Sequence, residues 1–441
     1  MTLSSNRREF MKKVTVVTGT VAASSVTRRV HATENNTINV AVVGCGGRGR
    51  GAAVEALSTQ GPTKLVATAD CFAERADSCA ELVADQHPDK VEVPKSRQFG
   101  GLDGYKHAID AVGPGGVVLL ATPPAFRPIH LEYAVEKGVH VFMEKSFAVD
   151  APGIRRLLKA GQLASEKNLK VAGGLMSRHA NALKAAIEEI HAGRIGDLVS
   201  CWTYRLHDAL GLFPKRPGDT ELAHQIRNYN NYTWLDGSFI VDSMIHNLDL
   251  CCWAKKAFPI SAQGQGGRQM RKEKDLLFDH YAVEYQFGDG TTLFAQGRHI
   301  NNCWGFFGIK LYGTKGLAIL GERITDPKIY RSWKTGNDNV IWRYTGEFNS
   351  FYQTEQDKFF AAIRNDTPLN ETERSAHSAM VGILGRMVVE SGQKITWDEA
   401  IHSNRELAPG LDHLKWDDDA PVMPDTDGHY PIAMPGVTQV L

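Results

Sequence analysis

The chain has 441 residues, and 50 Lys and Arg residues balance 50 Asp and Glu residues, so the formal net charge is zero. A chain without net positive charge lacks the overall field that holds nucleic acid or an anionic membrane surface, and we therefore expect no nucleic-acid partner. The composition, 42% hydrophobic and 23% charged residues, is that of a globular protein and excludes a disordered chain, while the length predicts two domains.

The N-terminal segment, residues 1–32, has the layout of an export signal. Arg7 and Arg8 lie in a basic segment, an uncharged stretch runs from Val14 to Val26, and Val30-His31-Ala32 fits a cleavage site. The uncharged stretch is shorter than the about 20 apolar residues that span a membrane, so we expect no stable membrane anchor. The paired arginines followed by Phe-Met-Lys resemble a twin-arginine signal, although Asn6 stands where Ser or Thr is usual.

We therefore expect residues 1–32 to be a signal peptide and the remaining chain to be periplasmic or secreted by the twin-arginine route. The alternative is a basic tail without a signal function. Six basic residues and one acidic residue lie in this segment, so the remaining chain carries a net charge near −5. The seven cysteines are odd in number and irregularly spaced, which predicts small buried hydrophobic residues rather than a disulfide framework or a zinc site.

A glycine-rich turn follows the first predicted strand of the remaining chain. The apolar run Thr37–Val43 predicts a buried parallel strand, and a helix is predicted over residues 50–59. Between them lies the motif G-x-G-x-x-G. Its first glycine permits a tight turn, its second lets the backbone approach a pyrophosphate, and its third allows close packing of the helix on the strand. The helix N-terminus adds N–H groups for phosphate. We predict a dinucleotide site made by Gly44, Gly46, Gly47, Arg48 and Gly49.

The next predicted strand, over residues 64–70, ends at Asp70, which lies about 20 residues beyond Gly49, as the acid of a dinucleotide-binding unit does. A carboxylate at this place accepts hydrogen bonds from a ribose diol and repels a 2′-phosphate. We therefore favour NAD as the cofactor, with NADP as the alternative. The competing interpretation is a glycine-rich turn in a βαβ unit that binds nothing.

Strands and helices keep alternating as far as residue 174, which predicts an α/β Rossmann domain over residues 37–160. The further strands are predicted over 116–121, 139–143 and 169–174, and the helices over 130–137 and 150–167. Ligands of open parallel sheets bind beyond the carboxyl ends of the strands. Thr122 and Pro123 follow one such end and Glu144 and Lys145 follow another, so we expect these four residues to face the cofactor.

The second half follows a different pattern, which predicts an α+β domain with a mainly antiparallel open sheet over residues 161–441. Glycine-containing turns separate two pairs of strands, which indicates two hairpins in succession. The hairpins span 280–296 and 307–320, an extended run spans 197–206, and helices are predicted over 181–193, 351–364 and 372–392.

One predicted helix, Phe239–Trp253, carries Asp242, His246 and Asp249 at a spacing that places them on one face. The functional interpretation is a histidine held by a neighbouring carboxylate as a general acid/base. The alternative is a core histidine with its hydrogen bonds satisfied. No other dense group of His, Asp and Glu accompanies this helix, so we predict no metal site.

Together these motifs resemble the family of glucose–fructose oxidoreductase, inositol dehydrogenase and MocA, over nearly all of the chain that follows the signal. The resemblance rests on the glycine motif, Asp70, Ala121-Thr122-Pro123, Glu144-Lys145, Ser177-Arg178 with Ile195-Gly196, and Asp242-x-x-x-His246-x-x-Asp249. It implies that Lys145, Asp242 and His246 are catalytic, and that the protein forms dimers or tetramers. The twin-arginine signal is similar to that of the secreted bacterial branch of this family. The family's usual Glu-Lys-Pro is here Glu144-Lys145-Ser146, so we expect a less rigid loop.

We expect the substrate to be a sugar or polyol. Aromatic and amide side chains of the second half offer stacking faces and groups that read hydroxyls, although several could be packing residues. These side chains are Trp202, Tyr204, Tyr229, Tyr232 and Trp234, with Arg227, Asn230 and Asn231. We predict substrate contacts for Arg178, Tyr204, Trp234 and Asp249.

The leading hypothesis is an NAD-dependent oxidoreductase that transfers hydride between nicotinamide and a secondary hydroxyl or carbonyl of a carbohydrate. Lys145 would stabilise the developing alkoxide, and His246 would take the hydroxyl proton. A redox-neutral enzyme with tightly bound NAD, such as an aldose–ketose oxidoreductase or an NAD-dependent glycosidase, is the second hypothesis. A non-catalytic sugar-binding protein is the third, and the intact Lys145, Asp242 and His246 argue against it.

Overall fold

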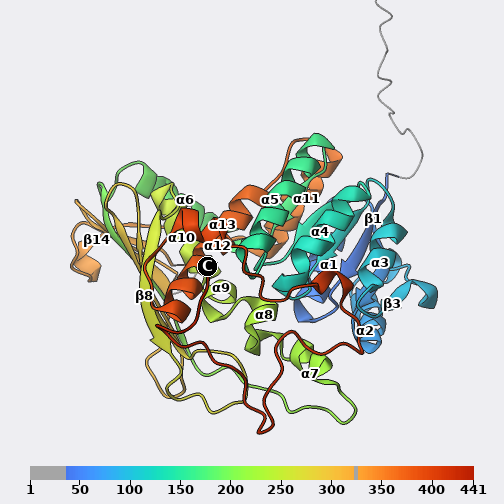
Figure 1. The fold of residues 1–441 in the computed structure, drawn as a ribbon. Helices are drawn as coiled ribbons and strands as arrows, with labels where there is room; N and C mark the ends of the chain where they lie inside the picture. The colour runs from blue at the N-terminus through green and yellow to red at the C-terminus, as the bar shows by residue number, and fades with distance from the viewer. Residues whose placement is uncertain (1–35, 322–325) are drawn as a thin grey trace, which may run out of the picture. The chain divides into compact units, whose positions relative to one another are not determined.

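The first half of the chain forms a six-stranded parallel sheet in the computed structural model, which describes residues 36–321 and 326–441 (Figure 1). The strand order is β3-β2-β1-β4-β5-β6, which is the Rossmann order that brings a dinucleotide to the switch point between β1 and β4. The strands are β1 (Ile38–Val43), β2 (Thr63–Asp70), β3 (Gln98–Gly100), β4 (Val117–Leu120), β5 (His140–Met143) and β6 (Val171–Gly173). The helices between them are α1 (Gly47–Leu57), α2 (Ala73–Ala84), α3 (Gly104–Val112), α4 (Arg127–Glu136) and α5 (Ala151–Glu166).

Both faces of this sheet are buried, which explains the continuous apolar runs in its sequence. Val40 and Val42 of β1 pack into one hydrophobic core, and Ala41 and Val43 pack into another. Alternate side chains of a strand point to opposite faces, so each face needs its own helical cover. The predicted domain boundary at residue 160 falls inside α5, and the parallel sheet continues to β6.

The second half contains a nine-stranded sheet in the order β14-β13-β12-β11-β7-β10-β9-β8-β15. It is antiparallel except for the parallel pair β7 and β10, and the two predicted hairpins are confirmed as the pairs β9–β10 and β11–β12. The predicted fold class is therefore confirmed. The strands are β7 (Leu198–His207), β8 (Ser261–Gly267), β9 (His280–Gln286), β10 (Thr292–His299), β11 (Phe306–Gly313), β12 (Leu317–Leu320), β13 (Lys328–Tyr330), β14 (Val340–Arg343) and β15 (Ile395–Thr396).

Helices of the second half connect the two sheets. The long helix α12 (Thr372–Ser391) packs against α5 of the Rossmann part and against α9, α10 and β8 of the second part. The helix α11 (Phe351–Arg364) returns to the Rossmann part and packs on α1. The others are α6 (Asn181–His191), α7 (Glu221–Arg227), α8 (Thr233–Asp236), α9 (Phe239–Asp242), α10 (Ile245–Lys255) and α13 (Trp397–His402).

The predicted signal peptide, residues 1–32, lies outside the described residues. Within residues 36–321 and 326–441, no helix combines the length and the apolar character needed to cross a bilayer. In the same part of the chain, no three His, Cys, Asp or Glu side chains gather closely enough to hold a metal ion.

Candidate functional site

The turn after β1 opens onto a cavity of about 870 Å³, counting its open mouth. Eight of the predicted cofactor residues line it together: Gly44, Gly46, Gly47, Arg48, Gly49, Asp70, Thr122 and Pro123. A Cβ atom added at Gly46 or Gly47 would meet no protein atom within 4 Å, so the backbone of these two residues is open to a ligand. A Cβ atom at Gly49 would lie 1.9 Å from the carbonyl oxygen of Gly44, so this glycine is required by the fold itself. The turn fits the pyrophosphate of a dinucleotide.

Asp70 is held at the edge of this cavity by backbone donors. The N–H of Cys45 donates to Asp70 Oδ2 at 2.8 Å, and the N–H of Phe72 donates to Asp70 Oδ1 at 3.0 Å. A carboxylate oxygen can accept more than one hydrogen bond, so both oxygens keep capacity for the hydroxyls of a ribose. The residues present therefore fit NAD.

Replacing Asp70 with serine tests this assignment. We expect the Kd for NAD to rise about 10- to 100-fold, because hydrogen bonds to a charged group are lost, while binding of NADP improves as the repulsion of its 2′-phosphate disappears. Isothermal titration of the purified protein with each nucleotide gives the two Kd values and hence the ratio of the Kd for NADP to the Kd for NAD. The control is Lys64→Ala, which removes an exposed ion pair with Glu92 on the strand that also carries Asp70. An unchanged ratio in Asp70→Ser would refute the role of this carboxylate.

Arg48, which lines the cavity, is also bonded to Glu144. Arg48 Nε donates to Glu144 Oε1 at 2.6 Å, its terminal nitrogens bind Glu55, and its guanidinium lies 4.5 Å from the centre of the Tyr352 ring. Burial raises the pKa of Glu144, and the charge of Arg48 opposes this shift. Glu144 is not among the residues that line the cavity. In the structure Glu144 anchors the side chain of Arg48, and its contact with the cofactor stays a prediction.

The predicted single helix Phe239–Trp253 is wrong, because the chain breaks between α9 and α10. Lys145 Nζ donates to the backbone oxygen of Asp242 at 2.9 Å, and Ser146 Oγ donates to the backbone oxygen of Val241 at 2.7 Å. These two carbonyls therefore serve the loop after β5 instead of the next helical turn. The N–H groups of Ser243 and Met244 both turn back to Phe239, and α10 begins afresh at Ile245.

The expectation of a looser loop at Ser146 is also wrong. Ser146 is fully buried, and its own carbonyl oxygen accepts from Arg127 Nη1 at 3.2 Å. The peptide bond between Lys145 and Ser146 is cis. The hydroxyl that replaces the usual proline ring thus adds a hydrogen bond that fastens the loop to α9.

The same loop brings the three predicted catalytic residues together. Lys145 Nζ also donates to Asp242 Oδ1 at 2.9 Å, and Asn230 donates to Asp242 Oδ2 at 3.4 Å. The Nδ1 atom of His246 is buried without a hydrogen-bond partner among the described residues. Burial lowers the pKa of His246 to about 3, and the charges of Lys145 and Arg205 contribute to this shift. The imidazole is therefore neutral near pH 7. Among the described residues no hydrogen bond joins Asp242 to His246. Asp242 therefore orients Lys145, whereas the sequence predicted that it orients the histidine.

The predicted substrate residues lie in other surroundings. Trp234 is fully buried and donates its indole N–H to Gln225 Oε1 at 2.7 Å, so the predicted substrate contact is wrong. The predicted substrate contact of Tyr204 is wrong as well. Tyr204 and Arg205 are consecutive on β7 and point to opposite faces of the sheet, and Arg205 is on the face that packs on α10. Tyr204 lies on the outer face of the sheet beside Trp202 and Phe306.

Arg178 and Asp249 form a bonded pair that holds three segments together. Arg178 Nε donates to Asp249 Oδ2 at 2.8 Å and Arg178 Nη2 donates to Asp249 Oδ1 at 2.9 Å. Ser378 of α12 donates to the same carboxylate at 2.7 Å, and Asp249 is 1% exposed. The predicted substrate contacts of this pair are corrected to a structural role, because both oxygens of Asp249 and two nitrogens of Arg178 are already bonded within the protein.

Sequence reasoning missed Arg127, which links the two loops that follow β4 and β5. Its side chain is buried and donates to the carbonyl oxygens of Thr122 and Ser146. It also missed Tyr105 and His130, whose rings stack at 4.1 Å and line the cofactor cavity. No spacing rule singles out these residues, since each becomes significant only when separate segments meet.

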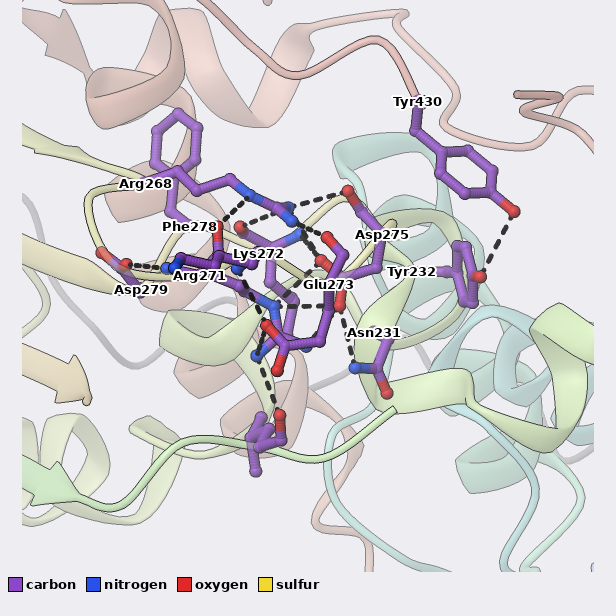
Figure 2. Close-up of polar contacts among 12 residues, drawn as sticks. Asn231, Tyr232, Arg268, Arg271, Lys272, Glu273, Asp275, Phe278, Asp279 and Tyr430 are labelled. Carbon is purple, nitrogen blue, oxygen red and sulfur yellow. Dashed lines mark hydrogen bonds and ion pairs between the residues drawn. The ribbon is translucent and has the colours of Figure 1, made fainter. Parts of the chain in front are cut away.

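A buried ionic cluster holds Asn231, the neighbour of Asn230 in the chain, as Figure 2 shows. Asn230 belongs to a short 3₁₀ helix, η5 (Tyr229–Asn231). Its neighbour Asn231 donates to Asp275 Oδ2 at 3.0 Å, and Asp275 is fully enclosed by Arg268 and Arg271 (Figure 2). Arg271 also donates to the carbonyl oxygen of Leu210 at 2.8 Å. The cluster therefore holds η5 through Asn231, and this positions Asn230 to donate to Asp242.

The chain is similar in sequence to curated sugar and polyol dehydrogenases. It is 26% identical over 331 residues to an inositol 2-dehydrogenase of Pseudomonas fluorescens (strain SBW25), which covers 74% of this chain and 86% of that protein. It is 26% identical over 208 residues to a UDP-N-acetylglucosamine 3-dehydrogenase of Acidithiobacillus ferrooxidans, covering 47% of this chain and 53% of that one. No family model matches the chain.

Solved structures share the fold. A scyllo-inositol dehydrogenase from Lactobacillus casei, solved with NAD(H) and scyllo-inositol bound, superposes with a TM-score of 0.61 at 19% identity, over 82% of this chain and 99% of that one. The sequence relatives and this shared architecture support the predicted resemblance to the family of glucose–fructose oxidoreductase, inositol dehydrogenase and MocA.

Proposed function

We propose that this protein is an NAD-dependent oxidoreductase that transfers hydride between the cofactor and a secondary hydroxyl or carbonyl of a sugar or polyol. One observation carries the proposal: the loop after β5 brings Lys145 to Asp242, beside the neutral His246. This loop follows the carboxyl end of β5, in the same sheet whose β1 carries the glycine turn. The inositol and UDP-N-acetylglucosamine dehydrogenases among the sequence relatives support a carbohydrate substrate.

The dinucleotide would be held by the open backbone of Gly46 and Gly47 and by the Asp70 carboxylate. When bound, NAD supplies the nicotinamide ring that accepts hydride from the carbon being oxidised. Every other task belongs to side chains of the chain itself.

Lys145 has one N–H left for the substrate. An ammonium carries three N–H donors, and two of them are used on the backbone oxygen and the carboxylate of Asp242. The third can donate to the oxygen of the reacting hydroxyl and stabilise its developing negative charge, an effect of about 3 kcal/mol by analogy with one oxyanion donor. Asp242 keeps the ammonium in one orientation.

His246 takes the hydroxyl proton in this scheme. Its imidazole is neutral in the protein without substrate, so it can accept a proton without first losing one. In the reverse direction the protonated imidazole returns the proton to the alkoxide.

The proposal is tested by the nucleotide content and the turnover of the purified protein. We expect the native protein to release nicotinamide nucleotide on denaturation or to bind added NAD, and a panel of sugars and polyols to produce NADH, measured by its ultraviolet absorbance. NAD that cycles without net NADH would favour the redox-neutral hypothesis. Failure to bind NAD or NADP would overturn both hypotheses.

We also propose that the outer face of the nine-stranded sheet mediates self-association. Half-exposed aromatic residues cover it: Trp202 stacks on Phe294 at 4.4 Å, and Trp304, which is 65% exposed, stacks on Phe306 at 5.6 Å. Uncovered aromatic patches of this kind mark interaction surfaces. Light scattering should give the mass of a dimer or tetramer, and a monomer mass would contradict the proposal.

Export by the twin-arginine route is proposed from the sequence of the N-terminal segment 1–32. Changing both Arg7→Lys and Arg8→Lys in the full-length chain should retain it in the cytoplasm, because the route reads the arginine pair. Cell fractionation with antibody detection measures the distribution. The matched control is the pair Arg28→Lys and Arg29→Lys, which keeps the first pair intact; equal export of all three proteins would refute the route.

A further inference from the structure

A second cation, Arg205, lies beside the three residues placed at the reacting centre. It occupies the inner face of β7, where its partners in the sheet are Gly297 on β10 and Phe307 on β11. A Cβ atom at Gly297 would lie 2.6 Å from Met244 Sδ. Met244, which lies in the break between α9 and α10, therefore packs directly on Gly297, the residue paired with Arg205 in the sheet. The break that carries Asp242 and His246 is thus packed over this arginine.

Nearby contacts keep Arg205 in this place. Asn247, which follows His246 on α10, donates to the backbone oxygens of Tyr204 at 3.0 Å and Gly308 at 3.1 Å. These bonds fasten α10 to β7 and β11 one position from Arg205, because Tyr204 and Gly308 are partners of each other in the sheet. The guanidinium carbon of Arg205 lies 4.1 Å from the centre of the Phe307 ring, which presents the planar group along an aromatic face.

Arg205 has no polar partner among the described residues, and its Nε atom is buried without a hydrogen bond. Other deeply placed arginines of the second half are paired: Arg178 with Asp249, Arg271 with Asp275 and Arg386 with Glu390. Asp242, whose charge acts on Arg205, is already bound to Lys145 and Asn230. Leaving the buried Nε donor without an acceptor costs free energy, so a partner that arrives from outside would stabilise the guanidinium.

We propose that Arg205 binds the carboxylate of the substrate, so that the substrate class is a sugar acid such as a hexuronate or an aldonate. The fork of a guanidinium matches a carboxylate through two parallel hydrogen bonds, and this geometry places the acid group next to the carbon that reacts. The inference rests on the proposed function of the site and adds to it the charge of the substrate.

The location of Arg205 favours a carboxylate over the phosphate of a sugar phosphate or a nucleotide sugar. Arg205 is close enough to the reacting residues for its charge to lower the pKa of His246, after the larger effect of burial. A carboxylate is attached directly to the sugar carbon chain, whereas the diphosphate of a nucleotide sugar is separated from the ring by the glycosidic oxygen. A carboxylate bound at Arg205 would offset its charge and raise the pKa of His246, which makes the imidazole a better base in the complex than in the free protein.

The first test compares acids with neutral molecules of the same shape. Titration calorimetry of the NAD-loaded, full-length protein is carried out with D-glucuronate, D-galacturonate and D-gluconate and with the amide of each. We expect at least one acid to bind about tenfold or more tightly than its amide, and the ratio to fall towards one in Arg205→Gln. Arg205→Lys keeps the charge but not the fork and should give an intermediate ratio.

Arg298→Gln is the matched control, because Arg298 lies on the outer face of the neighbouring strand and donates to the carbonyl oxygen of Trp304. Its ratio should equal that of the unchanged protein. The proposal is overturned if no acid binds more tightly than its amide, or if the ratio survives in Arg205→Gln. It is also overturned if glucose 6-phosphate or UDP-N-acetylglucosamine binds more tightly than every acid and loses this advantage in Arg205→Gln.

Turnover separates this inference from the proposed function. If acids bind through Arg205 but none of the panel yields NADH or cycles the bound cofactor, the proposed function fails and the anion site stands. If neutral sugars are oxidised as efficiently as the acids, the proposed function stands and the inference fails.

Discussion

We expect Lys145→Met to lower kcat about 100- to 1,000-fold, because it removes the one N–H that can stabilise the developing alkoxide. The substitution keeps the length of the side chain and removes its charge. Binding of NAD should change little, since Lys145 does not line the cavity that holds the glycine turn. Stopped-flow measurement of NADH formation, with saturating substrate, gives kcat directly.

Lys145→Met also leaves Asp242 with Asn230 as its remaining side-chain partner, so a loss of stability must be separated from a loss of chemistry. The matched control is Lys170→Met, which removes a different lysine that is also paired with an aspartate, Asp366, at 2.9 Å. Both variants should lower Tm, whereas only Lys145→Met should lower kcat. Equal kcat values in the two variants would refute the assignment of Lys145.

The second large effect is expected for His246→Gln, which should lower kcat about 100- to 10,000-fold through loss of the general base. Glutamine can donate and accept hydrogen bonds but cannot take up a proton near pH 7. His299→Gln is the matched control, because His299 is also buried and has its pKa lowered to about 4, yet its Nε2 atom donates to the carbonyl oxygen of Phe278. Activity of His246→Gln equal to that of the control would contradict the role of a base.

The pH profile gives an independent reading of His246. The base is active when deprotonated, so the rate falls only as the pH drops through its pKa. Because burial, Lys145 and Arg205 lower this pKa to about 3 in the free protein, kcat/KM should show no loss from this group between pH 5 and pH 8. Removal of either cation should raise the pKa and move the acid limb to higher pH.

The cofactor site could be predicted from the sequence because its chemistry is local. The glycine motif, Asp70 and the ends of β4 and β5 are each defined by a few consecutive residues, and the strand order then gathers them at one edge. Parallel strands must end at the same edge of the sheet, so no long-range information was needed.

The errors arose where distant residues decide local structure. The helix predicted over 239–253 breaks because Lys145 and Ser146, which lie far earlier in the chain, take two of its carbonyl groups. Alternation along β7 predicts that Tyr204 and Arg205 face opposite sides, but only the packing of α10 shows which side holds the site. The burial of Trp234 likewise depends on Gln225, a partner that no spacing rule identifies.

The central claim is hydride transfer between a bound nicotinamide and a carbohydrate carbon. It is tested most directly by incubating the NAD-loaded protein with carbon-perdeuterated glucose and carbon-perdeuterated glucuronate and recording the mass of the nicotinamide nucleotide. We predict reduced nucleotide that carries one deuterium from at least one of the two sugars, with the transfer lost in Lys145→Met and His246→Gln. Nucleotide that stays free of deuterium with both sugars, while it remains bound, would contradict the account.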